Sequence, residues 1–546
     1  MYKSKFQASN LSNNVLRKGR MIDESETPGM MVERVVNSLF EVEKKFGTDN
    51  AEIEKLKDEM GNYLDSKLCI FSTPILTNAG RHISRPLSAC TIPSVNLQST
   101  LKNITKVVNK LHIEGMGTGF DLDVLDDPIA TLMMLNNIAR KGAASGKEER
   151  PVGNIGILSI DHPEIKRFIL VKKEVENNNW KFNLSVNLTD VFMDSLKNRK
   201  WFYTKDGTKH DPQHLLNLIS ETAYHSAEPG VVFMDRMNND NPLPCLGDYH
   251  ATAPCGEIAL LPGESCQFGY INLGQFVVNQ KFDWDKLEKV AKLMTRALDN
   301  AVEISIENFS MEHNKQIMRL KRSIGVGICG LADMFIKLGL DYDQPESSVI
   351  AKEVMLFINY ISKHTSYELS KTRGSFEAMN IHKEGNRYLD ENDYITKKYA
   401  HLDTPKVSSQ MWKDLASHIK QEKSLRNGIT VALPPTGRSS MVIDASASIE
   451  PLFNHANLTP ELQKIKKETK NPNLFKTATK ISVHDHLRMV GEIAQTVDSS
   501  ISKTINIDST ASISEVFSVF AKSYDLGLKG ITVYRDQSLL VQPKIL

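Results

Sequence analysis

The stretch ATAPCGEIALLPGESCQFGYINL, residues 251–273, is the most unusual segment of this 546-residue chain. Near its start, Cys255 lies between a proline and a glycine, and near its end GYINL is an apolar run typical of a strand. A Pro-Cys-Gly turn suits neither a helix nor the interior of a strand, so we expect a loop tip that presents the thiol. Glu257 follows two residues later and brings a carboxylate beside the sulfur.

Strand-like runs similar to GYINL recur along the chain and alternate with amphipathic helical stretches. The runs are NIGILSI, FNLSVNL, GVVFM and GITVAL, and the helical stretches include residues 286–306 and 350–371. Alternation on this scale predicts an α/β architecture with parallel strands.

The N-terminal part has a different pattern. Residues 28–67 carry apolar side chains at helical spacing, interrupted near Gly47 and Asp49. We therefore expect a helical section over residues 1–68 and, because no sharp boundary follows it, one large α/β domain over residues 69–546.

Composition and charge exclude several classes of protein. With 40% hydrophobic and 24% charged residues, the chain can form a large globular core. Its formal charge of +1 gives no overall attraction to nucleic acid or to an anionic membrane. The first residues do not resemble a secretory leader, and no apolar run approaches the ~20 residues of a membrane span. We expect a soluble, cytoplasmic protein with no nucleic-acid or membrane partner.

Six cysteines in so long a chain are too few for a disulfide framework, and none lies in a C-x-x-C pair suited to zinc. Besides Cys255, Cys90 lies in the strand-like run RPLSACTIPSV and Cys266 follows within residues 251–273. A reactive thiol with a neighbouring general base would suit Cys255 and Glu257. The alternative for each cysteine is a role as a small packing residue. Three others resemble packing or loop cysteines: Cys69, Cys245 and Cys329.

Two turns could receive a phosphate. PPTGRSS, residues 434–440, follows the strand-like GITVAL and offers backbone N–H groups, hydroxyls and Arg438 in one turn. A tight turn with no ligand is the alternative there. GMGTG, residues 115–119, resembles a dinucleotide fingerprint only superficially, because the last glycine is not at the required offset.

Taken together, these segments resemble the catalytic subunit of ribonucleotide reductase, nearest to the adenosylcobalamin-dependent class II enzymes. Ten blocks follow the family order from about residue 70 to residue 538, among them FSTPILTNAG…RPLSACTIPS, GMGTGFDLDVL, EPGVVFMDRMNNDNPLP, RSIGVGICGLADMFIKLGLDYD and LKGITVYRDQS. The resemblance implies a ten-stranded α/β barrel, made of two antiparallel halves of five parallel strands. It also implies that Cys255 lies on a finger loop near residues 251–260.

The resemblance implies a role for each candidate residue. Cys255 matches the thiol that becomes a thiyl radical and removes the 3′ hydrogen of the substrate, and Glu257 matches the base for the 3′-hydroxyl. Cys90 and Cys266 match the pair that supplies reducing equivalents and ends as a disulfide. The predicted substrate-binding positions are Thr73, Ser88, Ala253, Thr436, Gly437, Arg438, Ser439 and Ser440.

Cofactor and partners follow from the same resemblance. Class I enzymes relay the radical through two adjacent tyrosines, whereas ITVYRD has the single tyrosine Tyr534 at that place, so adenosylcobalamin is the expected radical source. We expect no metal ligands in the chain itself. The expected partners are a ribonucleoside di- or triphosphate, an external dithiol reductant, either thioredoxin-like or a small thiol, and a second copy in a homodimer.

Three departures from the family keep alternatives open. Ala253 stands where the family has an asparagine that hydrogen-bonds the substrate hydroxyls. A methyl group can neither donate nor accept a hydrogen bond. The chain ends at VQPKIL without a C-terminal cysteine pair, and the specificity loop reads GKEERPVG at residues 146–153, so we expect external reduction and no deoxynucleotide control. The alternatives are a non-reductive radical transformation of a nucleotide and a non-catalytic nucleotide-binding paralogue. Retention of three cysteines and Glu257 together argues against the second.

Overall fold

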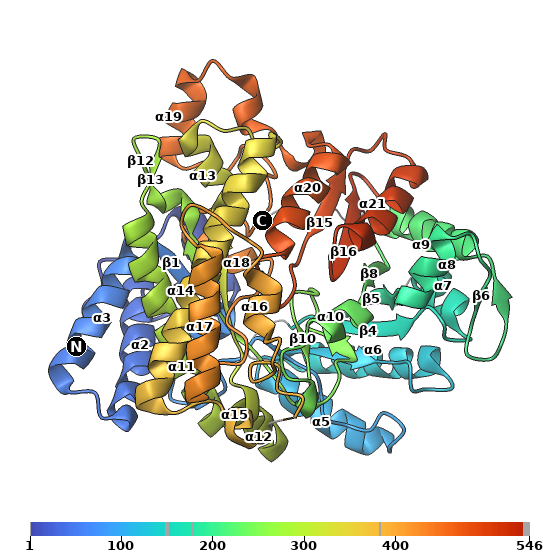
Figure 1. Ribbon diagram of the computed structural model, residues 1–546, viewed down its shortest axis with the longest axis horizontal. Coiled ribbons are helices and arrows are strands. Elements are labelled where there is room, and N and C mark those ends of the chain that lie inside the picture. Colours follow the sequence, from blue (N-terminus) through green and yellow to red (C-terminus); the bar gives the residue numbers. More distant parts are fainter. Residues whose placement is uncertain (1, 148–151, 176–178, 382–383, 539–546) are drawn as a thin grey trace.

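The computed structural model describes residues 2–147, 152–175, 179–381 and 384–538 and combines two main sheets with helices on their outer faces (Figure 1). The predicted specificity loop falls largely on residues outside this described part of the chain, and so does the C-terminal VQPKIL.

The larger sheet has seven strands in the order β15-β16-β8-β5-β4-β3-β2. Neighbouring strands are parallel, except that β8 and β16 are antiparallel. The runs NIGILSI and FNLSVNL form β4 and β5, and every residue of β4 is buried because both of its faces are covered. The predicted parallel α/β architecture is therefore confirmed. The strands are β2 (Cys90–Thr91), β3 (Gly117–Asp121), β4 (Asn154–Ser159), β5 (Phe182–Asn187), β8 (Gly230–Val232), β15 (Thr504–Ile507) and β16 (Gly530–Arg535).

The second sheet has three strands in the order β1-β11-β14. Strands β11 (Gln267–Asn272) and β14 (Ile324–Cys329) are parallel, and β1 (Cys69–Phe71) is antiparallel to β11. Two-stranded hairpins complete the β-structure: β6 (Phe202–Tyr203) with β7 (Lys209–His210), β9 (Ala251–Thr252) with β10 (Ala259–Leu260), and β12 (Val277–Val278) with β13 (Lys281–Phe282).

Single backbone bridges connect the two sheets. The bridge between Thr91 and Ser265 is antiparallel. The bridges between Val326 and Val431 and between Leu433 and Ile501 are parallel. The predicted strand GITVAL therefore contributes isolated bridges and not a continuous strand. The reason is visible at Thr430 and Val431, whose amides donate to the Asp498 carboxylate at 2.8 and 3.2 Å and are lost to a strand ladder.

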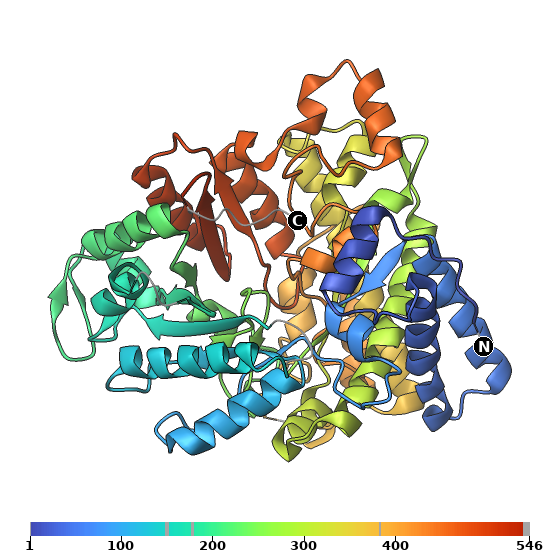
Figure 2. The same ribbon diagram turned by 180° about the vertical axis from the view of Figure 1, so that it is seen from behind.

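The predicted helical N-terminal section is present, and its break falls at Gly47, which has a φ of 76°. Its helices share one hydrophobic core with the rest of the chain, from Tyr2 to Val533. Helices α2 and α3 contact the long helix α11 (Trp284–Asn308) and lie at the opposite end of the molecule from the β6–β7 hairpin (Figures 1 and 2). The first four helices and the first 3₁₀ turn are α1 (Asn10–Lys18), α2 (Pro28–Glu41), η1 (Val42–Phe46), α3 (Asn50–Asp65) and α4 (Thr73–Asn78).

The remaining helices connect and cover the strands. Those that precede the β9–β10 hairpin are α5 (Leu101–Ile113), α6 (Pro128–Ala144), α7 (Ile165–Glu174), α8 (Asp190–Lys197), α9 (Pro212–Ser226), α10 (Met234–Asn239) and the 3₁₀ turn η2 (Pro244–Leu246). Those that follow it are η3 (Leu273–Phe276), α11 (Trp284–Asn308), α12 (Glu312–Lys321), α13 (Leu331–Leu338), α14 (Pro345–Arg373), α15 (Ala378–Ile381), α16 (Tyr394–Tyr399), α17 (Ser409–Glu422), α18 (Gly437–Val442), α19 (Pro460–Glu468), η4 (Pro472–Phe475), η5 (Ala478–Lys480), α20 (Val483–Ala494) and α21 (Ile513–Asp525). Within the described residues, none of these helices combines the length and apolar character that a bilayer crossing needs.

Candidate active site

Cys255 lies at the tip of the β9–β10 hairpin, where the sequence predicts a loop. The two strands are antiparallel, and the Gly256 amide closes the tip by donating to the Ala253 carbonyl at 2.9 Å. Gly256 has a φ of 75°, a left-handed conformation that glycine adopts without strain. The side chain of Cys255 is exposed, whereas Ala253 is fully buried at the base of the tip.

Two glycines of β3 allow the hairpin to lie directly against the larger sheet. A Cβ atom on Gly119 would lie 2.1 Å from the Thr252 carbonyl oxygen, so no side chain fits there. A Cβ atom on Gly117 would lie 3.2 Å from both Cys90 Sγ and Pro254 Cγ. The GMGTG motif therefore serves close backbone approach, and Gly117 marks the place where the hairpin tip meets Cys90.

Glu257 is 3% exposed, and burial raises the pKa of its carboxyl to about 7. Hydrogen bonds from its own amide and from the Cys255 amide act in the opposite direction without reversing this effect. Its Oε2 atom has no hydrogen-bond partner among the described residues, and its carbonyl accepts from the Ser500 amide at 3.0 Å. A carboxyl with a pKa near neutrality can accept and return a proton at physiological pH.

Cys90 and Cys266 lie on adjacent antiparallel segments. The Thr91–Ser265 bridge sets a register in which Cys90 is opposite Cys266, and the Ala89 amide donates to the Cys266 carbonyl at 3.3 Å. Cys90 is half-buried and Cys266 is 1% exposed. Burial, followed by the nearby carboxylates of Glu264 and Glu257, raises the pKa of the Cys266 thiol well above its usual value. Cys266 is therefore a protonated thiol at neutral pH.

Tyr270 is a residue of this site that sequence reasoning missed. It lies on β11, four residues after Cys266, and because side chains alternate along a strand the two share one face. Burial raises the pKa of its phenol well above the usual value. The next largest effects on this pKa are electrostatic and come from Glu257, Cys90, Cys255 and Cys266. Tyr270 therefore lies among the four predicted catalytic residues. Strand alternation counted from Cys266 would have been the signal to find it.

The predicted substrate-binding residues Thr73 and Ser88 differ in burial and in their contacts. Thr73 is half-buried at the start of α4, next to Ser72, whose amide donates to the β11 residue Phe268 at 2.9 Å. Ser88 is fully buried, and its hydroxyl bonds to Ser265 and Gln267 at 2.9 and 2.7 Å. These partners hold Ser88 between the two segments of the cysteine pair, while Thr73 stands beside β11.

The turn PPTGRSS leads into α18 and is anchored by Thr436, whose hydroxyl accepts from the Ser448 amide at 2.9 Å. Ser439 and Ser440 are buried. A Cβ atom on Gly437 would meet nothing within 4 Å, so the turn faces open space. Arg438 is half-buried and forms no ion pair with any described residue, which leaves a cation at this turn.

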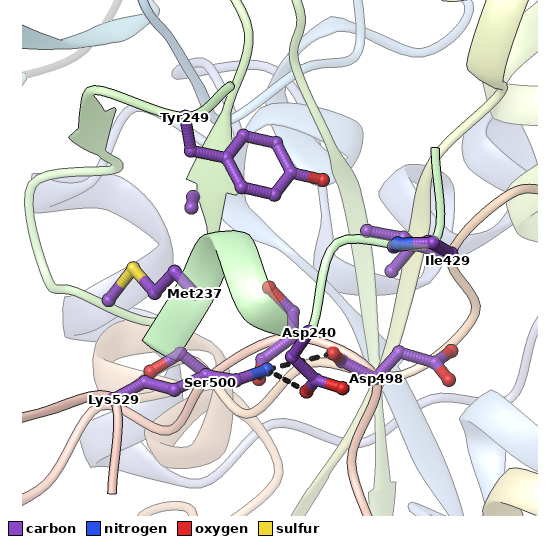
Figure 3. A pocket seen from close by; sticks show the side chains of 10 residues that line it. Met237, Asp240, Tyr249, Ile429, Asp498, Ser500 and Lys529 are labelled. Carbon is purple, nitrogen blue, oxygen red and sulfur yellow. Dashed lines mark hydrogen bonds and ion pairs between the residues drawn. The ribbon is translucent and has the colours of Figure 1, made fainter. Parts of the chain in front are cut away.

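A small pocket lies behind the hairpin, lined in part by Ala259 of β10 and by Ser500 (Figure 3). Lys529 reaches into it and pairs with Asp240 at 2.5 Å. Asp498 is 2% exposed; burial raises the pKa of its carboxyl, but the ion pair with Lys363 at 2.7 Å and hydrogen bonds lower it overall. The pocket behind the hairpin is therefore bordered by buried, paired charges.

The other cysteines do not reach this site. Cys69 and Cys329 are buried in β1 and β14, and burial raises the pKa of both thiols. Cys245 is half-buried in η2. Among the described residues, no group of three or more histidine, cysteine, aspartate or glutamate side chains is arranged to hold a metal ion.

The family model described as "Ribonucleotide reductase, barrel domain" matches residues 88–534. That range covers most of the chain and includes the β9–β10 hairpin, Cys90 and Cys266, and the PPTGRSS turn. The chain therefore belongs to the ribonucleotide reductase barrel-domain family.

Curated relatives carry related names. The chain is 31% identical to a "Vitamin B12-dependent ribonucleoside-diphosphate reductase" of Thermoplasma acidophilum, over 86% of this chain and 64% of that protein. It is 27% identical to a protein of the same name from Mycobacterium tuberculosis, over 85% and 70% of the two chains. A "Vitamin B12-dependent ribonucleotide reductase" of Streptomyces clavuligerus is 22% identical over 94% of this chain and 63% of that protein. This chain thus spans about two thirds of the length of these relatives.

Proposed function

We propose that this protein reduces ribonucleotides to 2′-deoxyribonucleotides through a thiyl radical on Cys255. The observation that carries the proposal is the meeting of one exposed cysteine, one buried carboxyl and two opposed cysteines on separate strands. The relatives named as B12-dependent ribonucleoside-diphosphate reductases support the reaction class and favour a diphosphate substrate.

Each residue then has one task. The Cys255 thiyl radical removes the 3′ hydrogen of the ribose, and Glu257 takes the 3′-hydroxyl proton. The 2′-hydroxyl leaves as water. Cys90 and Cys266 supply two electrons and two protons and become a disulfide, which an external dithiol then reduces. At the end the Cys255 thiol gives the hydrogen back to C3′ of the product and becomes a thiyl radical again.

Adenosylcobalamin is the proposed radical source, and it supplies a carbon-centred radical when its cobalt–carbon bond breaks. The site fits a bulky group here, because the Cys255 thiol is exposed and a side chain on Gly256 would meet nothing within 4 Å. The hairpin tip from Pro254 to Gly256 would face the cofactor, while the buried base of the hairpin keeps Ala253 and Glu257 away from water.

The seven-stranded sheet, the three-stranded sheet and the isolated bridges between them support the proposal of a ten-stranded barrel. One half would contain β2, β3, β4, β5 and β8, and the other β11, β14, residues 430–433, β15 and β16. The antiparallel β8–β16 pair and the antiparallel Thr91–Ser265 bridge would be the two seams. We further propose residues 1–68 as a helical section on this barrel, the PPTGRSS turn as its phosphate site, and a homodimer as the assembly.

One observation favours a second candidate, a non-reductive radical transformation of a nucleotide. Ala253 is fully buried at the hairpin tip and offers no hydrogen bond to a sugar hydroxyl. Without that contact, an intermediate could react in another way after the loss of the 3′ hydrogen.

Incubation with adenosylcobalamin, a dithiol and each ribonucleoside di- and triphosphate, followed by product analysis, separates the candidates. Deoxynucleotide formation that is lost in Cys255→Ser and kept in Cys245→Ser supports reduction. A different product or release of the base supports the second candidate. If nucleotides remain unchanged, both are wrong.

A further inference from the structure

The ring of Tyr270 has a defined position on the inner face of β11. Directly opposite it on β14 is Gly327, and a Cβ atom there would lie 3.3 Å from Tyr270 Cδ1 and 3.0 Å from the Ala432 carbonyl oxygen. The phenol ring thus occupies the space above a glycine. Phe268, two residues earlier, has the same relation to Gly325.

The Tyr270 hydroxyl differs from those of Tyr342 and Tyr388 and shares the lack of a partner with the buried Tyr394 hydroxyl. Tyr270 is 5% exposed, and its hydroxyl forms no hydrogen bond with any described residue. Tyr342 and Tyr388 are equally buried, and their hydroxyls donate to backbone carbonyls at 2.6 Å in both cases. The Tyr270 hydroxyl is not among the fully enclosed polar atoms, so an otherwise buried side chain presents an unpaired hydroxyl that a ligand can reach.

A second oxygen without a partner lies in the same place. Glu257 Oε2 is buried and has no hydrogen-bond partner among the described residues, and Glu257 is the first charged neighbour that acts on the Tyr270 phenol. The buried hairpin residue Ala253, two residues before Cys255, has only a methyl group, which can neither donate nor accept. The site therefore offers two oxygens to a ligand with two neighbouring hydroxyl groups.

We propose that the Tyr270 hydroxyl is a substrate-positioning group that hydrogen-bonds a ribose hydroxyl of the bound nucleotide. The inference rests on the proposed function and adds to it the residue that orients the sugar opposite Glu257. The phenol is protonated at neutral pH and can donate, while its oxygen can also accept.

Binding measurements without cofactor test this directly. The probes are ADP, CDP, GDP and UDP and, for the tightest binder, the 2′-deoxy and 3′-deoxy forms. We expect the wild type to bind the ribonucleotide roughly three- to tenfold more tightly than the form that lacks the bonded hydroxyl. In Tyr270→Phe this ratio should fall to about one, and in the control Tyr342→Phe it should stay at the wild-type value.

Thermal unfolding of the free protein gives a second readout. Tyr270→Phe removes a hydroxyl without a partner and should leave the melting temperature unchanged or higher, whereas Tyr342→Phe should lower it. Failure of Tyr270→Phe to fold would mean that the hydroxyl is structural and would overturn the inference.

The outcomes separate the two proposals. A Tyr270→Phe protein that still discriminates against the deoxy form overturns the positioning role and leaves the proposed function intact. A wild type that binds none of the four diphosphates overturns the proposed function, and the inference with it.

Discussion

Cys90 lies opposite Cys266 across two antiparallel segments that the Thr91–Ser265 bridge holds in register. Directly opposed residues of antiparallel strands have Cα atoms about 4.5–5.5 Å apart, within the range of a disulfide. Turnover without added dithiol should therefore oxidise this pair. Mass spectrometry after alkylation should find one new crosslink, between Cys90 and Cys266.

The buried thiols of Cys69 and Cys329 serve as internal controls for that oxidation, because they should stay reduced. Cys266→Ser should prevent the crosslink and limit product formation. A crosslink between any other pair would contradict the assignment.

Replacement of Cys255 should remove activity and preserve the fold. Its side chain is exposed at the hairpin tip, so Cys255→Ser should change the melting temperature very little while product formation falls at least about a thousandfold. Cys245→Ser, at the half-buried thiol of η2, is the control and should keep activity within about twofold. Equal loss of activity in Cys255→Ser and Cys245→Ser would show that Cys255 does not carry the radical.

Glu257 should control the pH dependence of activity. Its pKa of about 7 means that the carboxylate needed as a base forms only as the pH rises through neutrality, so activity should rise with pH around 7. Glu257→Gln should lose this acidic limb and most of the activity. If activity of Glu257→Gln still rises with pH near 7, another group is responsible for that pH dependence.

The raised pKa of Glu257 also affects stability, which should fall as the pH rises, whereas activity should rise. The folded-state pKa is raised above the ordinary 4.5, so the contribution of Glu257 is most favourable below pH 4.5 and is lost as the pH rises through 7. At about 1.4 kcal/mol per pKa unit, the change is about 3 kcal/mol. Glu257→Gln should therefore be more stable than the wild type at pH 8 and similar at pH 5, as measured by denaturant unfolding.

Gly119→Ala should displace the hairpin. The new Cβ atom would lie 2.1 Å from the Thr252 carbonyl oxygen, and relief of that clash should cost about 1–3 kcal/mol and reduce turnover at least tenfold. Gly491→Ala in α20 is the control, since its Cβ atom would meet Leu526 at an ordinary 3.5 Å. That variant should be as stable as the wild type or slightly more stable. Similar behaviour of the two variants would show that the hairpin is not held against β3.

Asp498→Asn should be strongly destabilising, by about 3–5 kcal/mol, because it leaves the buried Lys363 charge uncompensated. The pKa of Asp498 is lowered in the folded state, so its stabilisation is present above pH 4 and is lost as the solution is acidified. The difference in melting temperature between wild type and variant should therefore stay constant from pH 7 to about pH 4 and should narrow only as the pH falls further. Asp414→Asn, at an exposed position on α17, should stay within about 0.5 kcal/mol of the wild type.

Much of the fold could be predicted from hydrophobic pattern. The apolar runs at β4, β5 and β11 and the helical spacing over residues 28–67 correspond to the observed elements. GITVAL was misjudged, because its amides at Thr430 and Val431 bond to Asp498, a residue far away in the sequence. Only the tertiary structure brings that carboxylate to the strand.

The candidate site was predictable where chemistry is local. The Pro-Cys-Gly turn and the carboxylate of Glu257 occupy four consecutive residues and can be recognised in the sequence. Tyr270 lies in an ordinary strand and is recognised only from the residues that the fold places around it. The role of Gly119 could not be predicted either. The sequence of a glycine-rich turn is the same whether its glycines make room for a phosphate or for a backbone carbonyl oxygen.

The interior near Cys255 owes its shape to missing side chains at Gly117, Gly119, Gly325 and Gly327. These glycines carry no reactive group, yet none can gain even a methyl group without disturbing the hairpin, Cys90 or an aromatic ring of β11. Saturation mutagenesis with a growth readout should therefore find them as intolerant as the reactive thiols. The volume available at these four positions should therefore limit substitution as strictly as the chemistry of the thiols does.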